Sequence, residues 1–212
     1  MTGRALGRLL ETARGPLGPP VRVDLGTEIG PLRELGQILA VCNGFYLFNA
    51  GLQVFRAGDE GLGPELARWN HPDTWKETYG KQAEGVFCFA QDLFGVQFAI
   101  IDNKQVVAFD PETAQRTPLG ESMEEWAQWL LDDPQVRTAG PLATAWQDIH
   151  GALDHSNRLL PVQLFVLGGP YELANLRSVD AAEAMRIRGP LARQLRLASD
   201  GTIIDFHIGG NR

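Results

Sequence analysis

The segment between residues 85 and 131 constrains the fold of this chain most, because it alternates short apolar runs with turn-forming residues and then becomes helical. A turn-forming sequence at residues 102–104 (Asp-Asn-Lys) separates two of the runs and predicts a β-hairpin. A second turn-forming sequence, residues 110–113 (Asp-Pro-Glu-Thr), ends the last run. The runs have the length of β-strands and comprise residues 86–90, 96–101 and 105–109.

The helix that follows these strands is defined by its start signal. Ser122 and Glu125 have the spacing of a capping box, in which the two side chains satisfy free backbone N–H groups of the first helical turn. Trp126, Trp129 and Leu130 then recur at helical spacing. The pattern predicts a helix with an apolar face from Ser122 to about residue 131, ended by Asp-Asp-Pro at residues 132–134.

Upstream of these strands, the chain is divided by proline and glycine. Residues 15–20 hold three prolines and two glycines, and the Arg-rich helix expected before them should pack loosely or not at all. A second helix is predicted to start at Pro31 and to stop at Asn43-Gly44. Residues 45–55 are aromatic and strand-like, with an interruption at Ala50-Gly51. Residues 57–78 predict a polar surface loop with one short helix at residues 65–70.

The C-terminal part has weaker patterns. It predicts a short helix near residues 142–153, a strand at residues 162–167 and a last strand at residues 202–208. Between these strands, two helical pieces are expected at residues 181–187 and 191–197. Gly189-Pro190 should separate them, because proline removes a helical hydrogen bond.

Charge and composition exclude several functions. The 212 residues carry a net charge of −7, and residues 57–136 alone carry −10, whereas nucleic-acid binding needs a basic surface. The longest uncharged stretch, residues 35–55, is broken by Asn43-Gly44, so we expect no membrane segment. With two cysteines and no signal-peptide pattern, the chain is expected to be cytoplasmic.

No motif in the sequence predicts catalysis. The chain has no phosphate-binding loop, no dinucleotide-binding glycine motif and no nucleophile-elbow serine. His150 and His155 are five residues apart, which places them on different faces of a helix, so we predict no metal site and no cofactor. Cys42 and Cys88 lie in apolar segments and are expected to be buried structural thiols.

The tryptophans leave two interpretations open. Trp126 and Trp129 are expected to fill the core beneath the sheet. Trp69 and Trp75 lie in the acidic, loop-rich segment, where they are either core residues or exposed anchors of an interface.

Three stretches together resemble the SUKH superfamily, the Smi–Knr-like group named for fungal cell-wall-assembly regulators. The proline-started helix with its Asn-Gly stop, residues 30–45, resembles the first helix of that family. Asp92-Leu93-Phe94-Gly95 running into Val96-Gln97-Phe98-Ala99 resembles its central strand. Residues 109–113 followed by Ser122, Glu124, Glu125 and Trp126 resemble its strand–turn–helix exit. Residues 160–208 are similar to the extension of one bacterial branch.

The resemblance implies an α+β fold with a mixed, mainly antiparallel β-sheet flanked by helices and a C-terminal α+β extension. It divides the chain into an N-terminal arm (residues 1–24), a SUKH-like core (residues 25–135) and an extension (residues 136–212) that packs on the core as one compact unit. It also implies function by protein binding and not by catalysis, since bacterial members are mostly thought to be immunity proteins that neutralise toxins.

We therefore expect a non-enzymatic immunity protein whose partner is a toxin with a basic surface, such as a nuclease. Two alternatives remain: a cytosolic regulatory or scaffold module, and a small hydrolase using residues 148–155. Binding through acidic groups should weaken as salt rises. The partner-binding residues predicted from the acidic segment are Asp59, Glu60, Glu65, Trp69, Asp73, Trp75, Glu77 and Glu84.

Overall fold

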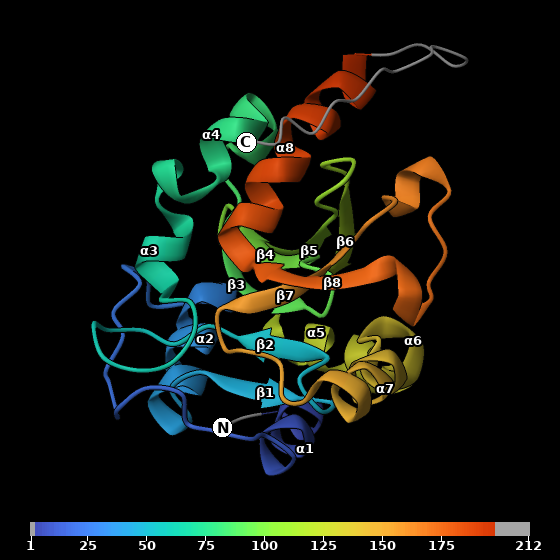
Figure 1. The fold of residues 1–212 in the computed structure, drawn as a ribbon. Helices are drawn as coiled ribbons and strands as arrows, with labels where there is room; N and C mark the ends of the chain where they lie inside the picture. The colour runs from blue at the N-terminus through green and yellow to red at the C-terminus, as the bar shows by residue number, and fades with distance from the viewer. Residues whose placement is uncertain (1–2, 198–212) are drawn as a thin grey trace.

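A six-stranded antiparallel sheet forms the centre of the protein, and the chain is an α+β fold as predicted (Figure 1). The structure is a computed structural model that describes residues 3–197. Its strands follow one another in chain order, and each is antiparallel to the one before it. They are β1 (Phe45–Leu47), β2 (Leu52–Val54), β3 (Phe87–Asp92), β4 (Gln97–Ile101), β5 (Gln105–Phe109) and β6 (Arg116–Gly120).

The predicted hairpin of β4 and β5 is confirmed, and the interruption expected at Ala50-Gly51 is a turn between two strands. The aromatic segment at residues 45–55 forms two strands, β1 and β2, joined by a turn in which three residues after Leu47 have positive φ. The last strand, β6, was not predicted, because it is polar and contains Pro118. As the outer strand of the sheet it tolerates a proline, since one side of an edge strand needs no ladder hydrogen bond.

Helices cover both faces of the sheet. On one face, Phe89 and Phe98 pack edge-on against Trp126 of α5 (Met123–Asp132), with ring centroids 5.0 and 5.9 Å apart. The predicted cap of α5 is confirmed: the Glu125 N–H donates to Ser122 Oγ at 3.1 Å. Beside α5 lie α1 (Arg4–Glu11) and α2 (Gly30–Val41), and α2 starts at the predicted proline.

The N-terminal helix α1 corrects the expectation of loose packing. Leu6 and Leu9 are buried against the core. The Glu124 carboxylate of α5 accepts hydrogen bonds from the Ala5 and Leu6 N–H groups at 2.7 and 3.0 Å. These N–H groups have no partner inside the helix, so a carboxylate at this position ties α1 to α5.

The opposite face is covered by the segment between β2 and β3 and by the C-terminal extension. The segment contains α3 (Leu66–Asn70), α4 (Lys76–Tyr79) and two 3₁₀ turns, Pro72–Thr74 and Gly80–Ala83. The extension contains α6 (Pro134–Arg137), α7 (Gly140–His150), the hairpin of β7 (Asn157–Pro161) and β8 (Leu176–Asp180), and α8 (Ala181–Leu197). It includes two further 3₁₀ turns, Phe165–Leu167 and Leu173–Asn175.

Two predictions in the extension are wrong. The strand expected at residues 162–167 lies earlier, at β7, and Phe165–Leu167 is a 3₁₀ turn. Helix α8 runs through Gly189-Pro190 without dividing. A Cβ at Gly189 would lie 2.3 Å from Thr78 Oγ1, so glycine here permits the close approach of α8 to α4. The strand expected at residues 202–208 lies outside the described residues. No helix within residues 3–197 is long and apolar enough to cross a membrane.

Candidate functional site

The acidic residues predicted to bind a partner are at the surface, but the fold does not gather them into one unit. Asp59, Glu60, Glu77 and Glu84 are exposed, and the last two line the same shallow groove. Glu65 caps α3 by accepting from the Arg68 N–H at 2.6 Å. Asp73 forms an ion pair with Arg68 at 2.8 Å and a hydrogen bond with His71 at 2.6 Å, and the His71 hydrogen bond is the main cause of its lowered pKa.

Trp69 and Trp75 are core residues, which corrects their assignment as partner-binding residues. Their exposed fractions are 4% and 0%. Trp75 packs against Tyr79 and Phe109, and the Trp69 indole N–H donates to Gln97 Oε1 at 2.8 Å. The polar composition of their neighbours suggested a surface loop, but the segment folds over the sheet and uses its aromatic side chains as the cover.

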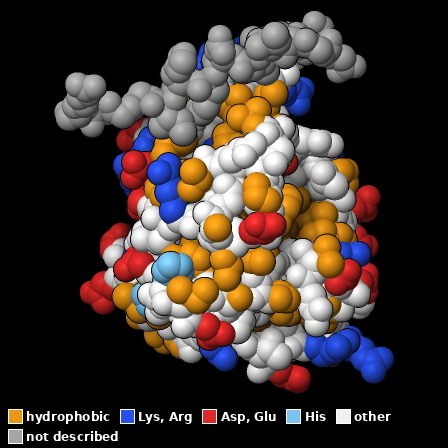
Figure 2. Space-filling view, turned by 45° about the vertical axis from the view of Figure 1, so that its right-hand side comes forward, with side chains coloured by type: hydrophobic (Ala, Val, Ile, Leu, Met, Phe, Trp, Pro, Cys, Tyr) orange, Lys and Arg blue, Asp and Glu red, His pale blue; other side chains and the backbone are white. Residues whose placement is uncertain are grey.

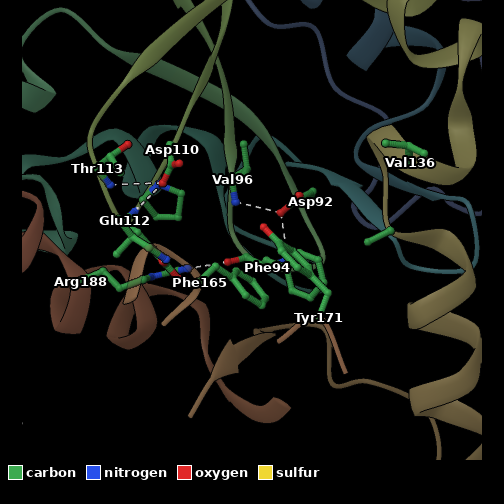
Figure 3. Close-up of a pocket in the computed structure, with 13 residues that line it drawn as sticks. Asp92, Phe94, Val96, Asp110, Glu112, Thr113, Val136, Phe165, Tyr171 and Arg188 are labelled. Carbon is green, nitrogen blue, oxygen red and sulfur yellow. Dashed lines mark hydrogen bonds between the residues drawn. The ribbon is translucent and has the colours of Figure 1, made fainter. Parts of the chain in front are cut away.

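The candidate site is a cavity of about 410 Å³ between the core and the extension (Figure 3). Three carboxylates line it: Asp92 at the end of β3, and Asp110 and Glu112 in the turn between β5 and β6. Arg188 of α8 and the segment that follows β7 form the other side. Three carboxylates of the acidic segment therefore lie at the junction of two parts of the fold.

Asp92 is held by the turn that it begins. Its Oδ1 accepts the Phe94 and Val96 N–H groups at 2.9 and 2.8 Å. Its exposed fraction is 8%, and burial raises the pKa of the Asp92 carboxyl to about 6. Hydrogen bonds from backbone N–H groups oppose that shift, but desolvation of the charged form outweighs them.

Glu112, a residue of the cavity lining, has an unsatisfied buried oxygen. Asp110 organises the turn by accepting from the Glu112 and Thr113 N–H groups at 2.7 and 3.2 Å. This places the Glu112 side chain against the extension, where Oε2 accepts from the Val166 N–H at 2.7 Å. Oε1 is buried and has no hydrogen-bond partner among the described residues. Burial raises the pKa of the Glu112 carboxyl.

Arg188 is a buried cation that is held by carbonyl groups. It is 1% exposed, and it donates to the Phe94 and Ala184 carbonyl oxygens at 2.6 and 2.9 Å. No carboxylate within the described part of the chain forms a salt bridge with it. Gly95 lies directly against it, since a Cβ there would be 2.7 Å from Arg188 Nη2.

Aromatic rings form the outer part of the cavity wall. Phe165 and Tyr171 are stacked with ring centroids 3.9 Å apart, and Phe94 meets both edge-on. Tyr171 is 64% exposed and Val136 is 77% exposed, so the wall continues onto the surface. The side of the molecule that carries α6, α7 and the segment between β7 and β8 turns toward the viewer in Figure 2, where hydrophobic side chains gather across the face.

A row of glutamines connects the cavity region to the middle of the sheet. Gln53, Gln91 and Gln97 are paired in register across β2, β3 and β4, and all three are fully buried. Arg158 of β7, itself 1% exposed, donates to Gln53 Oε1 and to the Asn157 carbonyl oxygen. The extension thus meets a polar part of this sheet face. The sequence signal for this polar contact is a glutamine inside each of three strands, which was not among the sequence predictions.

The histidines do not form a common site. His155 Nδ1 lies 3.1 Å from the Tyr46 hydroxyl, whereas His150 stacks on Trp146 at the end of α7. Within residues 3–197, no group of three or more His, Cys, Asp or Glu side chains has an arrangement that could hold a metal ion. Cys88 is fully buried, and burial raises the pKa of its thiol to about 12.

Comparison with known proteins gives likenesses of structure only. No family model matches the chain, and no curated protein matches it. Among solved structures, the chain is similar to the crystal structure of Atu4351 from Agrobacterium tumefaciens, with a TM-score of 0.47 and 13% sequence identity. The alignment covers 76% of each chain.

Proposed function

We propose that this protein is a non-enzymatic binding module of the SUKH type, and that it acts in the cytoplasm as an immunity protein that neutralises a toxin with a basic surface. The resemblance of the sequence to that superfamily motivates the class. The cavity supports the mode of action, because its carboxylates outnumber its one guanidinium and would attract a basic partner.

The observation that carries the proposal is the exposed apolar rim of the cavity. Val136, Val166 and Tyr171 line the cavity and are 77%, 39% and 64% exposed, and Leu167, the next residue along the chain, is 44% exposed. Large apolar side chains exposed together beside a concave site are typical of protein-binding surfaces. We call these four residues the apolar rim. It replaces the segment at residues 59–84 as the expected centre of the contact surface.

The test compares two substitutions of similar exposure. Val136→Asp places a charge in the apolar rim, and Val41→Asp places the same charge on an exposed valine outside the cavity lining, 68% exposed. The full-length protein is used to capture its partner, and the activity of the partner is measured with and without each variant. We expect Val136→Asp to weaken binding at least tenfold and to abolish inhibition, while Val41→Asp leaves both unchanged.

The alternative is a regulatory module that binds a protein of its own cell. It predicts that the partner sensitive to Val136→Asp is a host protein whose activity is regulated, and not a toxin that is inhibited. Equal binding by the two variants would remove the apolar rim from the interface and contradict the proposal in either form.

A further inference from the structure

We infer that the cavity binds the guanidinium group of an arginine side chain. The inference deepens the proposed function, since a basic partner would supply the arginine, but the recognition chemistry belongs to the cavity and can be tested without the partner. The side chains that line the cavity come together only where the turn after β3, the turn after β5 and the extension meet (Figure 3).

The charge of the lining favours a cation. Asp92, Asp110 and Glu112 contribute three carboxylates, and Arg188 contributes one positive charge. The Arg188 donors Nε and Nη1 are already used by two backbone carbonyl oxygens. An anion in the cavity would face the three carboxylates with little help from Arg188, so the lining selects against it.

The unsatisfied oxygen of Glu112 indicates that the ligand is a hydrogen-bond donor. Glu112 lines the cavity and is 4% exposed, and its buried Oε1 has no hydrogen-bond partner among the described residues. A buried carboxylate oxygen left unpaired is costly, and a ligand N–H group would remove that cost. Asp92 lies in the same lining with Oδ1 already occupied by two N–H groups, which leaves its Oδ2 as a second acceptor for such a donor.

The aromatic wall favours a planar cation over a compact ammonium group. Phe94, Phe165 and Tyr171 present a packed set of rings at the cavity, and Tyr171 is the most exposed of them. A guanidinium stacks on aromatic rings while its N–H groups reach carboxylates in the same plane. An ammonium group is a strongly hydrated point charge and gains less from such a wall. The volume of about 410 Å³ is within the usual range of ligand sites.

The test uses three capped amino acids as probes: Nα-acetyl-arginine amide, its lysine analogue and its citrulline analogue. Citrulline has nearly the shape of arginine but carries no charge. Binding to the full-length protein is followed by chemical-shift changes of the protein amides at pH 7.5 and low salt. We expect the arginine probe to bind with a Kd of about 1 mM or tighter, the lysine probe at least fivefold more weakly, and the citrulline probe not at all.

Two variants locate the binding in the cavity. Glu112→Gln keeps an acceptor for the Val166 N–H and removes the charge, and it should lower the affinity for the arginine probe at least tenfold. Tyr171→Ala alters an exposed side chain, so the variant should fold normally, and it should lower the affinity for the arginine probe severalfold. Glu121→Gln, at an exposed position outside the cavity lining, is the matched control and should bind like the wild type.

The outcomes separate this inference from the proposed function. Four results would each overturn the inference. The arginine and citrulline probes bind equally, or the arginine probe does not bind at 10 mM. Alternatively, neither Glu112→Gln nor Tyr171→Ala changes the affinity for the arginine probe, or the lysine probe binds more tightly than the arginine probe. If the arginine probe binds as expected while Val136→Asp leaves partner capture unchanged, the cavity recognises arginine and the proposed function is wrong. If Val136→Asp disrupts capture but the probe fails, the interface stands without an arginine in the cavity.

Discussion

Helix α5 and the C-terminal extension pack on opposite faces of the six-stranded sheet, and they contact it with different chemistry. Under α5 the contact is apolar, formed by Phe89, Phe98 and Trp126. Where the extension meets the other face, buried glutamines and two buried arginines, Arg158 and Arg188, form much of the contact. Apolar packing is non-directional, whereas buried polar groups require particular partners. The comparison suggests that the first face stabilises the fold and the second specifies how the extension sits and leaves charged groups available at the cavity.

The largest loss of stability is expected for a substitution on the face of the sheet under α5. Trp126→Ala removes a side chain that is 1% exposed and packs against two phenylalanines, and it should lower the free energy of unfolding by roughly 4 kcal/mol. Chemical denaturation measures the loss. Trp129→Ala, at a half-buried position on the same helix, serves as the control and should cost clearly less. Equal losses would show that burial against this face is not what makes Trp126 important.

A substitution where the extension meets the sheet should lower the free energy of unfolding by nearly as much. Gln53→Leu keeps the size of the side chain but makes it apolar, so it removes the partner of Arg158 and Gln91 and leaves buried donors unpaired. We expect a loss of roughly 3 kcal/mol, measured by the same denaturation experiment. Gln105→Leu, at an exposed position of β5, should change stability by less than about 0.5 kcal/mol. A neutral Gln53→Leu would mean that the glutamine row contributes no specificity.

The pH dependence of stability should report Asp92. The pKa of this carboxyl is raised by burial from 3.8 to about 6, so between these values the folded state holds a proton that the unfolded state has lost. Stability therefore falls as pH rises from about 4 to 6, by an amount of ~2–3 kcal/mol from this group. Glu112, whose pKa is also raised, adds a contribution of the same sign.

Denaturation of the wild type and of Asp92→Asn at pH 4.5, 5.5 and 7 measures this contribution. Asparagine keeps a side-chain oxygen for the Phe94 and Val96 N–H groups and does not titrate. The stability difference between the two proteins should shift in favour of the variant as pH rises. A difference that stays constant over this range would contradict the burial of a titrating carboxylate at this position.

The smallest expected effect concerns ligand binding at the cavity. The cavity is lined by the carboxylates of Asp92, Asp110 and Glu112, the Arg188 guanidinium and the exposed Tyr171. The positive charges of Arg158 and Arg188 act on Asp92 and oppose the rise of its pKa. Because Asp92 is mostly protonated at pH 5 and mostly ionised at pH 7, a cationic probe should bind about fivefold to tenfold more tightly at the higher pH. Titration of the arginine probe at both values checks this. Asp92→Asn should flatten the profile, and an unchanged slope in that variant would assign it to another group.

Local signals explain which elements could be predicted. The hairpin of β4 and β5, the cap of α5 and the start of α2 at Pro31 depend on residues a few positions apart, and all are confirmed. The errors occur where distant packing outweighs local preference. Helix α8 continues through Gly189-Pro190 because it lies against α4, and Trp69 and Trp75 are buried because their polar segment folds over the sheet.

The sequence by itself determined the hairpin of β4 and β5 and the apolar face of α5, because turns, caps and periodicity act within one or two turns of chain. The α+β class was expected from the family resemblance, and the structure shows it. Only the tertiary structure decided which of the 26 acidic residues are buried and which face solvent. Asp92, Glu112 and Arg188 share a cavity because three separate segments meet there. Desolvation depends on that meeting and not on neighbours in sequence, so the properties of the cavity could not be predicted from the sequence alone.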